Sequence, residues 1–321
     1  MLRLSCLIIV IDPSGSNKIE MPFINNIEIE KSRRSLTNTA KITVARNMKL
    51  FKANNRVDIN TIFQRGAHVE IQLGYNGDLK TEFSGYISDV GAKVPLEINC
   101  QDEMWSLKQN SFTKSWSKKV SVSEIIKYVY TGQAQIVDLE IGGFVLKKES
   151  TAQALDKLRK YGLQCYFDKG ILIVDFAGVI HNQGKEVIYD FDKNIVENNL
   201  EYKKKEDARI KVIGISKEHN GKKLEIIAGD NDGEIHTLHY TNMNKDQLQK
   251  IVTAEIDKLK YNGYTGSFKT FGLPYIEPGD VAVLNNDKYP DNDGSYLSES
   301  VKTTFGVDGF RREIELERKL A

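Results

Sequence analysis

The sequence has 321 residues, which is enough for two or three domains with apolar cores. Lys and Arg number 45 and Asp and Glu 44, so the net charge is +1, which argues against nucleic-acid binding driven by phosphate neutralisation. Three cysteines lie far apart without a CxxC pair, so we expect buried thiols rather than disulfides or a zinc site: Cys6, Cys100 and Cys165.

The N-terminal run Leu4–Ile11 is apolar but short. Asp12 and Pro13 follow it in place of a small-residue cleavage site, so it predicts an opening strand rather than a signal peptide. No stretch reaches the ~18 consecutive apolar residues of a membrane span. We therefore expect no membrane insertion by this chain and synthesis in the bacterial cytoplasm.

Residues 1–110 have the pattern of an all-β domain. Short runs such as Ile27–Glu30, Ala40–Ala45 and His68–Leu73 alternate apolar and polar side chains, as half-buried strands do. Asn76-Gly77 is typical of a tight hairpin turn, because both residue types accept positive φ angles. Several short strands separated by turns predict a first β-barrel domain, or a sandwich.

Helical signals appear next, within residues 111–184. Ser121 and Ser150 are each followed three positions later by Glu or Gln, the spacing of a capping box. Gly162 follows an apolar stripe and is a natural left-handed stop for the second helix. Residues 163–176 then read as a hairpin, so this region is predicted to be a small α+β insert.

Residues 185–321 return to β character with one long helix. Strands are predicted at Arg209–Ile215 and Leu224–Ile227, with a turn at Asn220-Gly221 between them. Asn244 caps a helix that runs towards Tyr261. We interpret this region as a second β-barrel domain crossed by the helix, with part of 185–215 returning to the first barrel as an alternative.

One strand pattern occurs twice, 210 positions apart. The segments Ile71–Leu73 and Gly85–Asp89 realign without gaps on Val281–Val283 and Ser295–Glu299. A third alternating run follows each copy, at Leu96–Cys100 and Arg312–Leu316. We interpret this as two related domains, and chance similarity between amphipathic strands is the alternative.

Motifs for catalysis or metal binding are not recognisable. His236 and His239 are three positions apart on an expected strand, so their side chains point to opposite faces. Asp230–Gly233 and Asp291–Gly294 resemble calcium loops but lack acidic residues at the first and twelfth positions. Three other histidines have no Ser or Cys partner at a motif spacing: His68, His181 and His219.

Nucleotide-binding motifs do not occur either, so we assign no catalytic, metal or cofactor-binding residue and expect no cofactor. The basic runs Lys147-Lys148 and Lys203–Lys205 are bracketed by glutamates and read as solvated faces. Trp105 and Trp116 flank the start of the insert. Packing there is the favoured role, with a carbohydrate platform as the alternative.

A set of short motifs, each weak alone, follows a specific order along essentially the whole chain. They are Phe83–Ile87, Ala152–Leu155, Tyr161-Gly162, Tyr166-Phe167, Gly263–Gly266, Gly272–Pro274, Pro278–Val281 and Asp308–Arg311. In this order the chain resembles the late-control-D-like tail hub proteins of contractile phage tails and related injection systems. These include the N-terminal portion of type VI secretion spike proteins.

The resemblance implies a non-enzymatic structural protein of the virion tail baseplate or the injection-particle baseplate. Family members carry two tube-like β-barrels, so a homotrimer presents six and adapts a sixfold tail tube to a threefold spike. Because the sequence ends at Ala321, directly after the last expected strand, we expect a separate spike protein. The implied partners are the tail tube protein, the spike, and tape-measure and baseplate wedge proteins.

Two other functional classes are retained. The first is a tail-associated peptidoglycan hydrolase whose catalytic carboxylates have no sequence signature among the many Asp and Glu residues. The second is a cell-wall-binding module that uses Trp105, Trp116 or the small insert.

Overall fold

The computed structural model describes residues 2–45, 50–52, 55–57, 62–168, 170–176, 184–217 and 221–320. Strands dominate these residues and helices are few and short, which confirms a mainly β fold with a small α+β insert. No described helix has the length and apolarity needed to cross a membrane.

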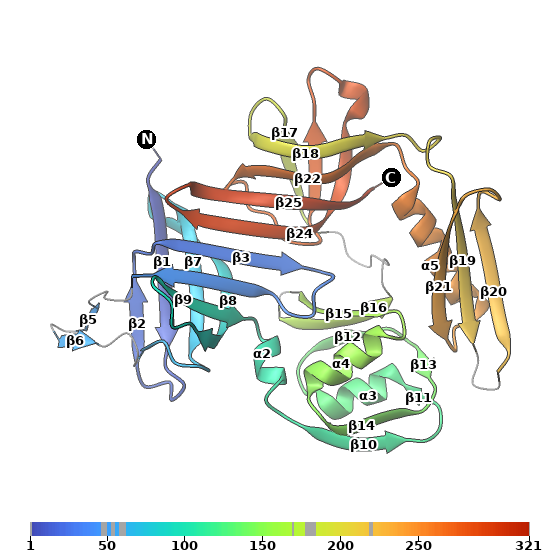
Figure 1. Ribbon diagram of the computed structural model, residues 1–321, viewed down its shortest axis with the longest axis horizontal. Coiled ribbons are helices and arrows are strands. Elements are labelled where there is room, and N and C mark those ends of the chain that lie inside the picture. The colour runs from blue at the N-terminus through green and yellow to red at the C-terminus, as the bar shows by residue number, and fades with distance from the viewer. Residues whose placement is uncertain are drawn as a thin grey trace.

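Thirteen strands form one large sheet, which Figure 1 shows as horizontal strands meeting upright strands. Seven come from the N-terminal region and are here called the first strand set: β1 (Leu4–Ile11), β2 (Lys18–Met21), β3 (Asn26–Ser32), β4 (Thr39–Val44), β7 (His68–Tyr75), β8 (Asp78–Val90) and β9 (Leu96–Gln101). Six form the second strand set: β17 (Glu186–Asp190), β18 (Ile195–Lys203), β22 (Gly263–Phe271), β23 (Val281–Asn285), β24 (Gly294–Gly306) and β25 (Gly309–Lys319).

The two strand sets are hydrogen bonded to each other. Strand β3 pairs antiparallel with β24, with Ile27 opposite Phe305 and Lys31 opposite Val301. The sheet order is β18-β22-β25-β24-β3-β4-β9-β8-β7-β1-β2, with β23 and β17 attached to β24 off this path. Through the described strands the path does not return to its start, so β18 and β2 are free ends.

Each strand set contains an antiparallel meander, β7-β8-β9 in the first and β23-β24-β25 in the second. The aligned residues Ile87 and Leu297 both directly precede a β-bulge against the third strand. The hairpins differ in register, however. Ile71 pairs with Phe83, whereas Val281 pairs with Leu297, four residues beyond Asp293, the position that aligns with Phe83. The gapless alignment therefore matches the strands but not their pairing.

The insert lies below the large sheet in Figure 1. Its elements are α2 (Met104–Leu107), β10 (Phe112–Trp116), β11 (Val120–Ser121), α3 (Val122–Val129), β12 (Ala134–Ile136), β13 (Glu140–Ile141), β14 (Phe144–Glu149), α4 (Thr151–Arg159), β15 (Leu163–Asp168) and β16 (Ile171–Phe176). The capping box at Ser150 and the positive φ of Gly162 are confirmed. At α3 only half of the box forms, because the carboxylate of Glu124 accepts from the Trp116 indole at 2.7 Å.

A separate three-stranded sheet stands beside the insert (Figure 1). It contains β19 (Ile210–Lys217), β20 (Lys223–Gly229) and β21 (Glu234–Thr241), and α5 (Lys245–Leu259) packs on it. Gly214 permits this contact, since a Cβ there would lie 2.5 Å from the Val252 side chain. The expected capping box at Asn244 is present, and the expected turn at Asn220 lies outside the described residues.

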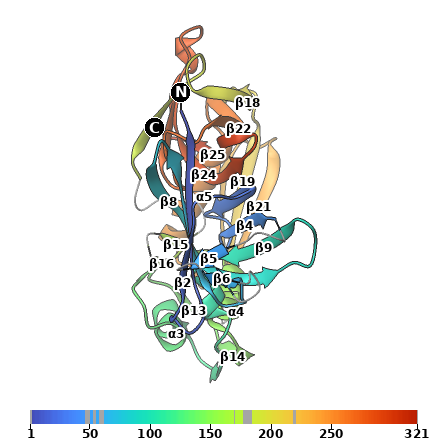
Figure 2. The same ribbon diagram turned by 90° about the vertical axis from the view of Figure 1, so that its left-hand side faces the viewer.

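The sequence predicted a single second β-barrel domain over 185–321, whereas β19, β20 and β21 form a sheet of their own. Ile210, Val212, Leu248 and Val252 share one buried cluster with Leu155 and other insert residues. Strands β17 and β18 join the second strand set, and no described residue of 184–217 pairs with the first. The alternation of a strand shows that one face is buried, but not which sheet it joins. Figure 2 shows the narrow side of the resulting molecule.

Three further short elements lie among the described residues: β5 (Leu50–Lys52), β6 (Asn55–Val57) and a 3-10 turn, Pro290–Asn292. Strand β5 pairs with β6.

Candidate functional site

Histidines and acidic loops flagged in the sequence remain apart in the structure. His236 lies 3.7 Å from Glu234, and His239 is exposed. Asp230 accepts from the backbone of Ile210 and pairs with Lys260, so its loop is held within the small sheet. His181 and His219 lie outside the described residues. Within the described ranges, no three potential metal-ligating side chains come together.

Both tryptophans have packing partners. Trp105 stacks on Tyr86 with ring centroids 5.2 Å apart, and Trp116 meets Tyr128 edge to face at 5.6 Å. One Ser–His contact could not be found from motif spacing. Ser84 Oγ lies 3.2 Å from His68 Nε2, but the two residues are on neighbouring strands. The ring contacts support packing as the role of Trp105 and Trp116.

Alternating charges cross the exposed face of the large sheet, and we call this row the charge ladder. Register places five side chains side by side on β18, β22, β25, β24 and β3: Glu197, Lys269, Glu313, Lys302 and Glu30. Lys269 Nζ lies 2.9 Å from Glu197, and Lys302 Nζ lies 3.1 Å from Glu30. A hollow of about 730 Å³ lies over part of this row, lined by residues of β3, β22, β24 and β25 that include Glu30, Lys302 and Glu313. The face is therefore hollowed over part of the row, and it carries alternating charges, with three Glu against two Lys in the ladder.

The loop of residues 33–38, between β3 and β4, touches three parts of the molecule. Arg33 donates to the Tyr166 hydroxyl of the insert at 3.1 Å and lies 3.7 Å from Glu317 of the second strand set. Arg34 pairs with Glu299. The backbone N–H of Asn38 donates to Asp102 at 2.9 Å. The loop therefore ties both strand sets to the insert.

Two carboxylates at this loop are buried. Burial raises the pKa of Glu299 to about 7, although the nearby Arg34 charge opposes the shift. Burial likewise raises the pKa of Asp102 to about 6, against the opposing N–H groups of Asn38 and Met104. Glu299 is the extra residue of the bulge between β24 and β25, which explains its inward direction. Both shifts are caused by burial, Glu299 beside Arg34 of the loop and Asp102 beside Asn38 and Met104.

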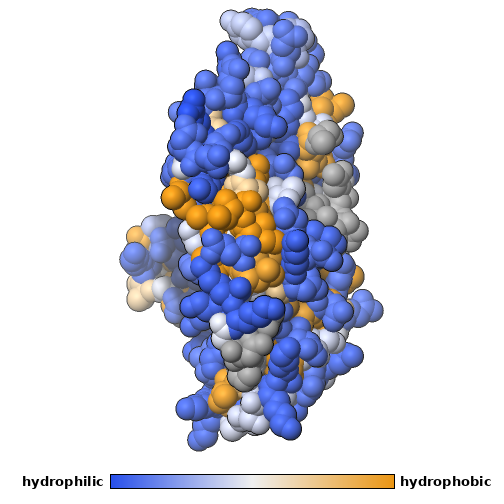
Figure 3. Space-filling view, turned by 90° about the vertical axis from the view of Figure 1, so that its right-hand side faces the viewer, coloured by the Kyte–Doolittle hydropathy of each residue, from blue (hydrophilic) through white to orange (hydrophobic). Residues whose placement is uncertain are grey.

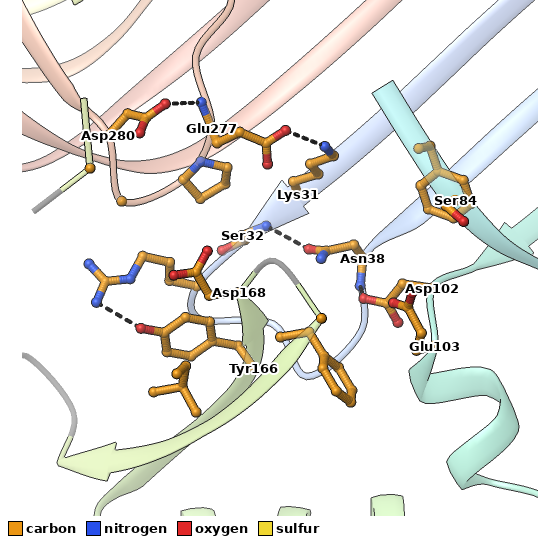
Figure 4. A pocket seen from close by; sticks show the side chains of 18 of the residues that line it. Lys31, Ser32, Asn38, Ser84, Asp102, Glu103, Tyr166, Asp168, Glu277 and Asp280 are labelled. Atoms are coloured by element: carbon orange, nitrogen blue, oxygen red, sulfur yellow. Dashed lines mark hydrogen bonds and ion pairs between the residues drawn. The ribbon is translucent and has the colours of Figure 1, made fainter. Parts of the chain in front are cut away.

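A cleft of about 540 Å³ opens between the strand sets and the hairpin β15–β16 (Figure 4). Several of its polar groups bind one another: Lys31 pairs with Glu277 at 2.6 Å, and Asp280 accepts from the backbone N–H groups of Glu277 and Lys185. These groups satisfy one another across the cleft. They do not form a convergent set of the kind that binds a small ligand.

The outer face of the small sheet carries exposed apolar side chains among polar ones. Ile227 on β20 and Ile235 on β21 are more than half exposed, and Figure 3 shows apolar side chains gathered on this side of the molecule. Ile213 of β19 lies opposite Ile227, whereas Ile235 lies opposite Lys211. Exposed apolar surfaces of this kind are typical of contact surfaces.

No protein-family model matches the chain, and no curated protein matches it by sequence. Solved structures do match over nearly the whole length. A tail protein from Neisseria meningitidis MC58 is 15% identical with a TM-score of 0.62, covering 99% of this chain and 97% of that one. The 43 kDa tail protein of prophage MuSo2 from Shewanella oneidensis is 13% identical with a TM-score of 0.62, covering 97% and 96%.

A third match is the Escherichia coli c3393 protein, described as a type VI secretion component similar to the T4 bacteriophage tail proteins gp27 and gp5. It is 10% identical with a TM-score of 0.56, and the match covers 92% of this chain and 73% of that chain. At such low identity the similarity concerns the fold. The chain thus has the fold of phage tail proteins and of a related secretion component.

Proposed function

We propose that this protein is a structural baseplate hub of the late-control-D-like type, in a contractile phage tail or a related injection system. Three copies form a ring that adapts the sixfold tail tube to a threefold spike. The observation that carries the proposal is one continuous sheet in which two meanders lie in neighbouring strand sets. Whole-length similarity to tail proteins supports it.

Free sheet ends give the ring a means of closure. Strand β18 has nine residues, six of which are exposed, and natural proteins rarely leave such an edge uncovered. In the ring, β18 of each copy pairs with the first strand set of the next copy. This contact joins unlike faces and closes after three rotations.

The concave face with the charge ladder lines the lumen of this ring. Opposite charges on adjacent strands neutralise one another, so the lining holds no strong field that would retain a charged chain passing through it. The tail tube protein docks on one end of the ring and a spike on the other, with tape-measure and baseplate wedge proteins as further partners. Synthesis takes place in the bacterial cytoplasm, before assembly into the baseplate.

Mass photometry of the full chain tests the ring. A species of three times the 36.4 kDa chain mass is expected, and a monomer at every concentration would overturn the proposal. Asn198→Pro supplies a directed test at the edge strand. The N–H of Leu200 contacts its own strand's Asn198 side chain at 3.4 Å and so faces the free edge, and the N–H of Asn198 faces the same way.

Asn198→Pro therefore removes a donor from the edge without breaking the pairing of β18 with β22. The trimer fraction should fall strongly in this variant, while the matched control Asn198→Ala should behave as the wild type. A cell-wall-binding module that uses Trp105 or Trp116 has less support, because both side chains are engaged in packing. A peptidoglycan hydrolase is the other alternative, and clearing of purified peptidoglycan by the chain in a zymogram would support it.

A further inference from the structure

The junction between the strand sets contains a fully buried ion pair. Arg312 of β25 and Glu82 of β8 are 230 positions apart, and their side chains are 1% and 3% exposed. Arg312 Nη1 donates to Glu82 Oε2 at 2.9 Å and Nη2 to Oε1 at 2.5 Å. The two charged groups thus meet in a bidentate geometry, which fixes their direction as well as their distance.

Arg312 is held from several sides by the second strand set. Its Nε donates to the Gly272 carbonyl at 2.7 Å and Nη1 also donates to Thr303 Oγ1 at 3.0 Å. The guanidinium carbon lies 4.9 Å from the Tyr275 ring and 5.2 Å from the Phe310 ring. The guanidinium is therefore a rigid part of the second strand set.

Glu82 reaches this position because of a β-bulge. Ile71 pairs with Phe83 and Gln72 pairs with Thr81, which leaves Glu82 as the extra residue of β8. Glu82 and Phe83 are both buried, so the in–out alternation of the strand is broken here. A bulge redirects one side chain, and this one directs the carboxylate of the first strand set into the second.

An apolar pair would fill the same space at a lower desolvation cost, so maximal stability does not account for two charges here. We infer that Arg312 and Glu82 are positioning residues that fix the angle between the two strand sets. Their bidentate contact admits one relative orientation, whereas apolar side chains would admit several. The consequence for ring assembly rests on the proposed hub function, because three copies close only if both sets keep the correct angle.

Pulsed electron paramagnetic resonance on the full chain tests this inference. Spin labels at Lys18→Cys and Asp287→Cys, both exposed positions, report the distance between the strand sets. The three native cysteines are buried. The labelled chain is diluted with an excess of unlabelled chain, so that only distances within one copy are recorded. With the ion pair intact, a single narrow distance distribution is then expected.

The double variant Glu82→Met/Arg312→Met should keep the melting temperature of the labelled parent or exceed it, while the distance distribution broadens or shifts and the trimer fraction falls. Arg312→Lys keeps the charge but not the bidentate geometry, and should give an intermediate broadening. Lys31→Met/Glu277→Met removes a partly exposed ion pair across the same junction and should leave the distribution unchanged.

A folded double variant with an unchanged narrow distribution would overturn the inference. If the double variant does not fold, the distance distribution of Arg312→Lys is the test. An unchanged distribution in that variant overturns the inference. The two proposals can fail separately. If the labelled wild type is monomeric while the variants still broaden the distance distribution, the hub proposal is refuted and the positioning role stands.

Discussion

The same kinds of charged residue join the strand sets in two places, inside the junction and on the open face. Inside, Arg312 and Glu82 are withdrawn from water and bound to several fixed groups. On the face, Lys302 lies between Glu28 and Glu30 and remains partly hydrated. Burial therefore decides what an ion pair does. The buried pair fixes the angle between the strand sets, and the exposed row sets the charge pattern of the surface.

The largest expected effect comes from separating the inner pair. Arg312→Met alone leaves the Glu82 carboxylate buried without its partner, which should lower the free energy of unfolding by about 3–5 kcal/mol. Urea denaturation followed by tryptophan fluorescence measures this change. Arg311→Met is the matched control, because the neighbouring Arg311 is partly exposed and should cost below about 1 kcal/mol. Equal losses of unfolding free energy in Arg312→Met and Arg311→Met would contradict the distinction between buried and exposed charges.

An intermediate and pH-dependent effect is expected at Glu299. Its pKa rises on folding from an ordinary 4.5 to about 7, so the folded state binds a proton more tightly than the unfolded state. The contribution of Glu299 to the free energy of unfolding is therefore highest below pH 4.5, and it is lost as the pH rises through the folded-state pKa of about 7.

Glu299→Gln removes this dependence. Because Arg34 is 55% exposed, it stays hydrated without its partner. The variant should melt at a higher temperature than the wild type above pH 7, and the difference should vanish towards pH 4.5. Thermal melts at pH 5, 6, 7 and 8 measure it. A difference in melting temperature that stays constant from pH 5 to 8 would disprove the raised pKa of Glu299.

The smallest effect is expected on the charge ladder. Lys302→Met should change the free energy of unfolding by roughly 0–1 kcal/mol, because its partners remain in contact with water. Screening should reduce even this change in 1 M salt. Denaturation at low and high salt checks the value, and a loss comparable to that of Arg312→Met would show that the two regions do not differ.

Local features of the fold could be predicted from the sequence. Asn76 and Gly77 have positive φ angles of 54° and 85°, as the hairpin turn requires. The capping boxes at Ser150 and Asn244 depend only on residues three positions apart, and both form. At Ser121 the reciprocal bond is absent, because a tertiary partner, Trp116, takes the Glu124 carboxylate.

Long-range features could not be predicted in the same way. Glu82 lies in an alternating run, and nothing local indicates that a bulge turns it towards a residue 230 positions away. The charge ladder likewise depends on the register of five strands from distant parts of the chain. Predicting either would require knowing the pairing of β3 with β24, which no local pattern specifies.

A threefold reconstruction of the assembled chain by cryo-electron microscopy tests the central claim most directly. The account predicts a closed ring in which β18 of each copy pairs with the next copy and Lys302 and Glu313 face the lumen. A ring with the charge ladder on its outer surface, or particles without threefold symmetry, would contradict it.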